Sequence, residues 1–407
     1  MLYPRKIFKQ AEKWLFKDEF IIFTGARQTG KTSILIMVKN FLEEKGKSSF
    51  YFNLENPEYL QLLNKHPYNI FELMPKSKSR QTAIIDEIQY LDNPTNFLKL
   101  LYDEKRSKIK VIASGSSSFY IDKKFKDSLV GRKILFEVYS LDFNEFLIFS
   151  AKGGSAPGGN IQEDLLKQKN KKLSVYYKNK LKELWNRYLI YGGYPKVVLA
   201  EDNDSQRIIL EDIVSSYIKK DISDAGIKNT DKYFALLKIL ASQTGELVNT
   251  QELANTLNIA HKTIEEYLYV MKKSYQVAFI KPFYKNARKE LTKMPKVYFY
   301  DLGLRNFLLS NFDLINKRTD KGAYLENIVF KEFLKQTQDI NFINFWRTQD
   351  KKEVDFIVEG KNAFEIKFDG VKIKEKKYSQ FKSFYPEMEF NFLNYSEILE
   401  KFYQWKI

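Results

Sequence analysis

Residues 20–42 read FIIFTGARQTGKTSILIMVKNFL: an apolar run, a loop with two glycines, and apolar residues at helical spacing. The loop from Gly25 to Thr32 matches the spacing G-x-x-x-x-G-K-[ST]. In this pattern the backbone N–H groups turn inward around phosphates, the lysine reaches the terminal phosphates, and the last hydroxyl ligates Mg²⁺. The segment therefore predicts a buried strand, a phosphate-binding loop and a helix that together hold a nucleoside triphosphate.

The predicted nucleotide contacts cover the whole loop and the start of the helix. They are Gly25, Ala26, Arg27, Gln28, Thr29, Gly30, Lys31, Thr32 and Ser33. We expect Lys31 also to act in catalysis and Thr32 to bind the metal. The alternative is a glycine turn that joins a strand to a helix without a ligand, but a chance match usually lacks the preceding strand and the following helix.

A second apolar strand, residues 82–87, ends in the acids Asp86 and Glu87. A triphosphatase needs a carboxylate near Mg²⁺ and a second group that orients the attacking water. We assign the metal to Asp86 and the water to Glu87; the alternative is a solvated acidic turn. Residues 49–54 and 109–116 read as further strands. Ser114 or Ser116 is a candidate sensor of the terminal phosphate, although a Ser/Gly turn after a strand is nearly as common.

Several motifs together resemble the AAA-type P-loop ATPases of the STAND-like branch of archaea and bacteria. They are Gly25 to Thr32, Ile84 to Gln89, Gly115-Ser116-Ser117-Ser118, Gly131-Arg132 and Gly192-Gly193-Tyr194-Pro195. The resemblance implies ATP and Mg²⁺ as cofactors, a charge-stabilising role for Arg132, and packing of Pro195 on the adenine. The proline usual after the first loop glycine is Ala26 here. For Arg132, a surface arginine at a helix end is an equal alternative.

Composition limits the remaining function classes. The chain of 407 residues carries a net charge of +16, but its lysines are spread widely, so charge alone does not establish an anionic partner. The absence of cysteine excludes disulfides and thiolate chemistry. His66 and His261 are far apart and read as surface or capping residues. No signal core and no run of about 18 apolar residues is present, so we expect a cytoplasmic protein without a membrane partner.

The rest of the chain divides by composition and periodicity. After an ATPase core at 1–150, residues 151–175 form a Gly- and Lys-rich insertion and residues 176–230 a helical lid. Residues 231–310 resemble a winged helix, with Asn249 as an N-cap and a hairpin whose segment 281–296 holds six basic residues and one acid. Six phosphate contacts would give a salt slope of about −5. The alternative is a winged helix that only packs on neighbouring domains.

A second constellation of charged residues lies in residues 311–407. Two predicted strands, 352–358 and 363–367, place Glu365 and Lys367 on one face, where Asp355 of the partner strand can approach. Carboxylates about 4 Å apart repel by about 4 kcal/mol at an effective dielectric of 20, so this arrangement favours a cation such as Mg²⁺. Lys367 can then activate a water for phosphodiester attack, and Glu326 can complete the metal shell.

These residues resemble the PD-(D/E)xK restriction-endonuclease-like fold over about residues 322–369, with Gly322 to Asn327 and Phe345-Trp346-Arg347 as further support. By this resemblance the catalytic residues are Asp355, Glu365 and Lys367, and the metal ligands are Glu326, Asp355 and Glu365. The alternative is an ion-pair network on a solvated strand face.

The sequence as a whole predicts an α/β protein: a P-loop NTPase parallel sheet with a helical lid, followed by a winged helix and a small α/β nuclease-like domain. The predicted function is Mg²⁺-dependent ATP hydrolysis coupled to nucleic acid, DNA above all. A second reading is a nucleotide-dependent signalling or scaffold switch whose nuclease-like domain only binds nucleic acid or protein. A third, a transporter-associated or metabolic enzyme, is disfavoured by the basic hairpin. Homo-oligomers and protein partners stay open.

Overall fold

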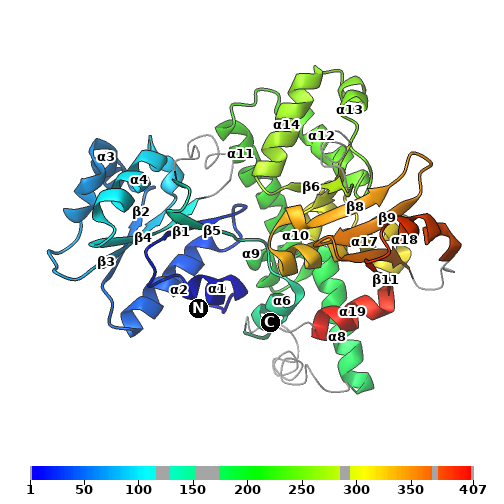
Figure 1. Cartoon of the computed structure of the whole chain (residues 1–407), viewed down its shortest axis with the longest axis horizontal. Coiled ribbons are helices and arrows are strands. Elements are labelled where there is room, and N and C mark those ends of the chain that lie inside the picture. Colours follow the sequence, from blue (N-terminus) through cyan, green and yellow to red (C-terminus); the bar gives the residue numbers. More distant parts are fainter. Residues whose placement is uncertain (1, 116–128, 153–173, 285–293, 369–374, 405–407) are drawn as a thin grey trace. The chain divides into compact units, whose positions relative to one another are not determined.

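The computed structural model describes residues 2–115, 129–152, 174–284, 294–368 and 375–404, and the chain divides into two compact units (Figure 1). The first unit comprises Met1–Tyr139 with Lys273–Tyr275, and the second comprises Ser140–Lys272 with Gln276–Ile407. Each unit has a sheet of its own, and each is described separately below.

The first unit contains a five-stranded parallel sheet in the order β2-β3-β4-β1-β5. Its strands are β1 (Phe20–Thr24), β2 (Ser49–Asn53), β3 (Gln81–Asp86), β4 (Ile109–Gly115) and β5 (Lys133–Glu137). The parallel α/β sheet predicted from the sequence is confirmed. The edge strand β5 was not predicted; its side chains are half-buried or exposed, so it lacks the burial of the central strands.

Helices cover both faces of this sheet. Alternate side chains of β1 enter two different cores: Ile21 and Phe23 pack with α1 (Lys6–Glu12) and α2 (Lys31–Glu44). Phe20 and Ile22 pack with α3 (Pro57–Lys65), α4 (Pro94–Lys105) and the short 3₁₀ turns η1 (Pro67–Phe71) and η2 (Ile88–Tyr90). The central strands β1, β3 and β4 are buried on both faces, which explains why an apolar run marks each of them in the sequence.

The second unit begins with a helical region, as the sequence predicts for residues 176–230. Its helices are α6 (Phe143–Lys152), α8 (Val175–Tyr191), α9 (Pro195–Val198), α10 (Asn203–Asp212), the π-helical turn η4 (Ile213–Ile218) and α11 (Lys219–Asp224). Aromatic packing holds its centre: the ring centroids of Phe143 and Trp185 lie 4.7 Å apart. The predicted insertion lies mostly outside the described residues.

Three helices follow: α12 (Thr230–Ser242), α13 (Thr250–Leu257) and α14 (His261–Lys273). The predicted N-cap at Asn249 is confirmed, because its side chain accepts from the backbone N–H groups of Gln251 and Glu252 at 3.1 and 3.2 Å. Asn258, with φ 50°, turns the chain between α13 and α14 in the left-handed conformation that asparagine tolerates. Helices α13 and α14 are thus joined by a short turn.

A mixed six-stranded sheet in the order β11-β10-β9-β8-β6-β7 completes the second unit. Its strands are β6 (Val277–Pro282), β7 (Lys296–Phe299), β8 (Ile343–Arg347), β9 (Glu353–Val358), β10 (Asn362–Lys367) and β11 (Glu389–Asn394). The accompanying helices and 3₁₀ turns are α16 (Leu302–Leu308), η5 (Ile315–Lys317), α17 (Lys321–Thr337), η6 (Ile340–Phe342), η7 (Glu375–Tyr378), α18 (Ser379–Phe384) and α19 (Tyr395–Gln404).

The predicted hairpin and the predicted C-terminal strands share this sheet. Strand β6 pairs with β7 antiparallel and with β8 parallel, through Lys281 opposite Asn344 and Pro282 opposite Phe345. The sequence-based boundary at 310/311 therefore divides one continuous hydrogen-bonded sheet between two predicted domains.

The Gly192-Gly193 pair packs inside the second unit. The N–H of Gly193 donates to Asp301 at 2.9 Å, and the N–H of Leu141 donates to the carbonyl of Gly193 at 2.7 Å. A Cβ on Gly193 would lie 2.3 Å from the oxygen of Leu141. Asp301 also caps α16 by accepting from Gly303 at 2.9 Å. Close backbone packing therefore accounts for Gly193, and the side chain of Asp301 leaves no room for a Cβ on Gly192.

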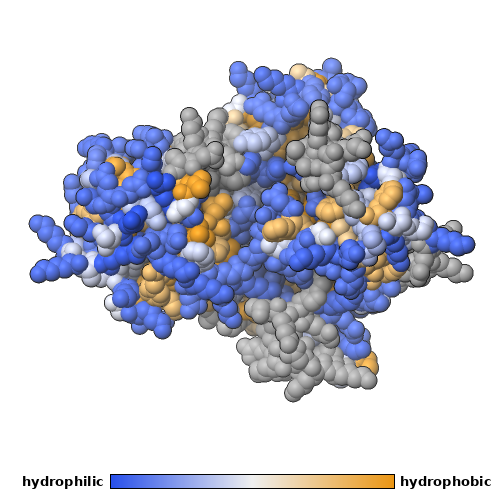
Figure 2. Space-filling view, viewed as in Figure 1, coloured by the Kyte–Doolittle hydropathy of each residue, from blue (hydrophilic) through white to orange (hydrophobic). Residues whose placement is uncertain are grey.

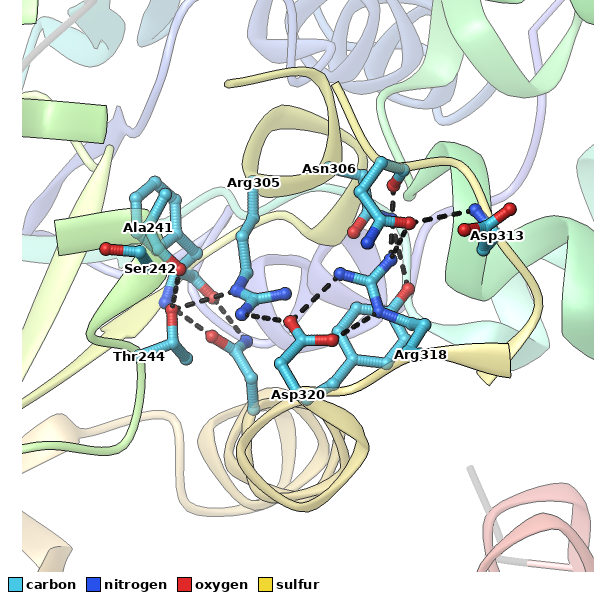
Figure 3. Close-up of polar contacts among 12 residues, drawn as sticks. Ala241, Ser242, Thr244, Arg305, Asn306, Asp313, Arg318 and Asp320 are labelled. Carbon is cyan, nitrogen blue, oxygen red and sulfur yellow. Dashed lines mark hydrogen bonds and ion pairs between the residues drawn. The ribbon is translucent and has the colours of Figure 1, made fainter. Parts of the chain in front are cut away.

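A buried network of arginine and aspartate joins α12, α16 and α17 (Figure 3). The Arg305 guanidinium, fully buried, donates to Thr244 at 2.9 Å and to Asp320 at 2.7 Å. Arg318 donates to the same carboxylate at 2.8 and 3.0 Å and lies over the ring of Tyr324 at 4.2 Å. One carboxylate thus holds two guanidinium groups just before α17.

On the face seen in Figure 2, hydrophobic side chains occur in small groups on a mainly hydrophilic surface. Within the described residues, no helix is both long enough and apolar enough to cross a membrane.

Candidate functional site

The loop that follows β1 has the backbone of a phosphate cradle. Gly25 has φ 151° and Gly30 has φ 92°, conformations that L side chains rarely adopt. A Cβ on Gly25 would lie 2.1 Å from the carbonyl oxygen of Val138, so only glycine fits there. Gln28, with φ 62°, provides a further turn. The loop ends at the N-terminus of α2, where unsatisfied N–H groups favour an anion.

Lys31 lies inside this loop. Its side chain is buried, and its ammonium donates to the carbonyl oxygens of Gly25 at 3.0 Å and Ala26 at 2.7 Å. Thr29 stabilises the same turn, because its hydroxyl donates to the Ala26 carbonyl at 2.9 Å. Thr32 and Ser33, the next residues of α2, are exposed. The loop carbonyl groups therefore hold the Lys31 ammonium. The next residue in the sequence, Thr32, is exposed to solvent.

Arg5 is a residue of this site that the sequence reasoning missed. Its guanidinium is buried and donates to the carbonyl oxygens of Thr29 at 2.7 Å and Tyr139 at 3.0 Å. It thereby ties the middle of the phosphate loop to the chain that follows β5. Its partners lie 24 and 134 residues away, so no local pattern could have revealed it.

Asp86 and Glu87 lie at the end of β3, as predicted. The Asp86 carboxylate is 2 % exposed and accepts from the Tyr51 hydroxyl at 2.7 Å, from the Glu87 N–H at 3.1 Å, and from the Ser114 hydroxyl. Glu87 has φ 57°, and its carboxylate accepts from the Gln89 amide. Burial, together with the hydrogen bond to Asp86, raises the pKa of Tyr51, so this phenol remains a donor.

The phosphate loop, Asp86 and Ser114 thus lie at the same edge of the sheet, where β1, β3 and β4 end. In a parallel sheet the carboxyl ends of β1, β3 and β4 share an edge, and ligands of open α/β sheets bind there. Hydroxyl and carboxylate oxygens are the donors that Mg²⁺ prefers. Thr32 and Asp86 supply this chemistry, and the glycine-lined loop leaves the space that a phosphate needs, so the residues fit ATP with Mg²⁺.

Arg132 does not lie near the phosphate loop of its own chain. Its carbonyl accepts from the N–H of Phe20, the first residue of β1, whereas the phosphate loop follows the last residue of that strand. Its guanidinium pairs with Asp103 at 2.7 Å. The structure therefore places Arg132 at the opposite end of the sheet from the phosphate loop.

Two further predicted residues lie elsewhere. Pro195 begins α9 in the second unit. Ser116, like the rest of the predicted Gly-Ser turn after Gly115, lies outside the described residues, and so do four of the six basic residues of the predicted hairpin.

The second predicted site is a buried cluster of acids and lysines. The register of β9 and β10 pairs Phe356 with Phe364, and Asp355 and Glu365 are the next residues of the two strands. Asp355 accepts from the Ile366 N–H at 2.7 Å. One oxygen of Glu365 accepts from Lys367 and from Tyr378 at 2.7 Å, whereas its Oε2 has no hydrogen-bond partner among the described residues.

Glu326 of α17 also belongs to the cluster. The Lys296 ammonium lies between Glu326 and Glu353 of β9. The Lys296 ammonium lies 3.6 Å from Glu326 Oε2 and 2.5 Å from Glu353 Oε1. Glu326 also accepts from the Tyr298 hydroxyl at 3.0 Å, and Arg347 pairs with Glu353 at 2.6 Å. Lys296, predicted as a phosphate contact in the basic hairpin, is 2 % exposed and therefore cannot serve that role.

Burial and like charge govern the electrostatics of this cluster. Burial, then Glu326 and Glu365, raises the pKa of Asp355 well above its usual range. Burial also raises the pKa of Glu326. Although these acids influence one another, no three acids or histidines of the described residues gather closely enough to hold a metal ion. The predicted residues are thus brought together, but as a lysine–carboxylate network.

Models of protein families match three parts of the chain. Residues 17–147 match an AAA domain, which supports an AAA-type P-loop domain in the first unit. Residues 182–314 and 321–398 match two domains of unknown function, DUF8612 and DUF4143.

The chain is also similar to uncharacterized proteins of distant organisms. One from Haemophilus influenzae is 28% identical over 355 residues, which cover 84% of this chain and 80% of the relative. One from Methanocaldococcus jannaschii is 26% identical over 363 residues, covering 88% and 76%. The similarity therefore extends over most of this chain and most of the length of these relatives.

Among solved structures, the RuvB Holliday junction branch migration motor of Thermotoga maritima is 15% identical and covers 72% of this chain and 95% of its own, with a TM-score of 0.32. DnaA of Aquifex aeolicus is 18% identical and covers 66% and 87%, with a TM-score of 0.31. Neither score supports an argument about function.

Proposed function

We propose that the first unit hydrolyses ATP with Mg²⁺. The observation that carries this proposal is the glycine-lined loop, which holds a buried Lys31 at the start of α2 and belongs to the same sheet edge as Asp86. The match of residues 17–147 to an AAA domain supports it independently.

Each residue has a defined part in this reaction. The loop N–H groups and Lys31 bind the phosphates, for which the ammonium exchanges its two backbone carbonyl acceptors for phosphate oxygens. Thr32 and Asp86 would hold Mg²⁺, which neutralises charge on the phosphate oxygens when bound. Glu87 orients the attacking water, and Tyr51 and Ser114 fix the Asp86 carboxylate by donating to its two oxygens.

Two variants test the assignment. Lys31→Ala should abolish ATP turnover, because the loop loses its cation. Glu87→Gln should still bind a fluorescent ATP analogue while turnover falls by about 10² or more, since general-base and positioning groups contribute about 10²–10⁴.

The matched controls are Lys39→Ala, which removes a partly exposed lysine of α2, and Glu72→Gln, which changes an exposed acid. Both should keep the turnover of the unaltered protein. Normal turnover in Lys31→Ala or Glu87→Gln would overturn the assignment.

We propose DNA as the partner of the second unit, on the strength of the α13–turn–α14 pair. A helix–turn–helix presents its second helix to the major groove. Helix α14 has the exposed residues Lys262, Glu266, Tyr269 and Lys272 on its surface. Duplex binding should weaken about uniformly across DNA sequences in Lys262→Ala, because a lysine–phosphate contact carries no sequence information. Absence of duplex binding by the unaltered protein would favour a protein partner.

For the nuclease-like part, the geometry favours binding over cleavage. Lys367 and Lys296 are engaged with Glu365, Glu326 and Glu353, and within the described chain no trio of carboxylates is poised for one ion. The second unit then acts as a nucleotide-dependent switch. Plasmid incubated with the protein, ATP and Mg²⁺ or Mn²⁺ should stay intact; nicking that disappears in Asp355→Ala would establish a nuclease instead.

A further inference from the structure

Lys296 has the most demanding environment of any lysine in the carboxylate cluster. It begins β7, its side chain is 2 % exposed, and its ammonium lies 5.4 Å from the centre of the Phe345 ring. A buried ammonium is tolerated only when anions surround it. Glu353 at 2.5 Å and Glu326 at 3.6 Å provide them.

Three basic side chains pair with three of the four carboxylates of the cluster, and the fourth carboxylate, that of Asp355, accepts from the Ile366 N–H. Lys367 pairs with Glu365, Arg347 pairs with Glu353, and Lys296 serves Glu326 and Glu353 together. Burial alone lowers the pKa of Lys296, but the surrounding Glu326, Asp355 and Glu353 outweigh it and hold the pKa above its ordinary value. The two carboxylates, 2.5 and 3.6 Å from the ammonium, therefore favour the charged form of Lys296.

Three elements supply the acids, and a fourth supplies the cation. Glu326 comes from α17, Glu353 and Asp355 from β9, and Glu365 from β10. Lys296 reaches Glu326 and Glu353 because the β6–β7 hairpin continues the same sheet beside β8. The cation is thus part of the fold and lies far from the acids in sequence.

We propose that the Lys296 ammonium takes the position that a divalent cation would occupy, so that the carboxylates of this unit bind no Mg²⁺ or Mn²⁺. A divalent ion requires several oxygens at about 2.0–2.1 Å in near-octahedral geometry for Mg²⁺. It would also be repelled by an ammonium that already contacts two of those carboxylates. This inference rests on the second unit alone and is independent of ATP hydrolysis by the first.

Mn²⁺ binding to the full chain tests the proposal. Lys31→Ala is present in every sample and no nucleotide is added, so that no nucleotide-bound metal forms at the phosphate loop. Any Mn²⁺ held there by Thr32 and Asp86 alone would not depend on Asp355. In this background Mn²⁺, followed by electron paramagnetic resonance, should show no binding that depends on Asp355. Adding Lys296→Met should lower the Kd for Mn²⁺ at least about tenfold, because one positive charge is removed at similar side-chain length. Adding Asp355→Asn should then abolish the new site.

Two outcomes contradict the proposal. One is Mn²⁺ binding in the Lys31→Ala chain that is lost when Asp355→Asn is added; this comparison needs no change at Lys296 and holds even if Lys296→Met fails to fold. The other is a folded Lys296→Met chain, judged by circular dichroism, that takes up no Mn²⁺. Lys296→Arg is the matched control, because it keeps the cation and should gain no metal.

Discussion

Asp320 holds the two buried guanidinium groups of Arg305 and Arg318 (Figure 3). Asp320→Asn leaves both without an anion, and loss of one partner of a buried pair costs about 3–5 kcal/mol. Because the Asp320 side chain is 26% exposed, we expect a loss of about 3 kcal/mol in the free energy of unfolding of the second unit, measured by urea denaturation.

The stabilisation by Asp320 should also depend on pH, in a direction set by the shift of its pKa. Although burial opposes it, the hydrogen bonds and charges of Arg318 and Arg305 lower the pKa of Asp320 from 3.8 to about 2. The stabilisation is therefore present above about pH 4 and is lost as pH falls towards 2, by about 2 kcal/mol. The difference between the unaltered protein and Asp320→Asn should shrink over that range. Asp313→Asn, at an exposed aspartate, is the control, and a difference independent of pH would contradict the prediction.

Single residues could be predicted where spacing along the chain encodes them. Lys31 and Asp86 follow from the loop and strand patterns, and the His66 side chain accepts from Tyr68 as the capping residue we expected. Arg5 and Lys296 could not be predicted in their observed roles, since their partners are distant in sequence. Arg132 matched a motif, but its position beside Phe20 depends on how β5 joins the sheet.

At the scale of elements, the turn between α13 and α14 depends on Asn258. A residue with a Cβ is strained at φ 50°, by about 1–2 kcal/mol for most L residues, whereas asparagine and glycine tolerate it. Asn258→Ala should therefore lower the free energy of unfolding by about 1 kcal/mol, and Asn258→Gly should have a smaller effect. Thermal unfolding of both variants checks this order; an alanine variant as stable as the glycine variant would contradict it.

Elements with strong periodicity were predictable, and their partners were not. Both strands of the 353–367 hairpin are found where the sequence placed them, and Asn249 caps a helix as predicted. The pairing of β6 with β8 was missed because it joins Lys281 to Asn344 across 63 residues, where no local pattern operates. The predicted domain boundary therefore fell within a sheet.

At the scale of the whole molecule, ATP should stabilise the unit that binds it. A ligand at about 100 times its Kd stabilises the folded state by about 2.7 kcal/mol. MgATP at that level should raise the unfolding temperature of one calorimetric transition, that of Met1–Tyr139 with Lys273–Tyr275. The shift should be absent in Lys31→Ala. A shift of equal size in that variant would show that the nucleotide binds elsewhere.

The sheet shared by β6 and β8 also decides how this chain can be shortened. A fragment of residues 311–407 would lose β6 and β7, so β8 would become a bare edge that can template aggregation. The same cut would remove Lys296 and leave Glu326 and Glu353 facing each other without their ammonium. Any soluble piece of the C-terminal half therefore has to begin before Val277, even though the matched region at 321–398 suggests a later start.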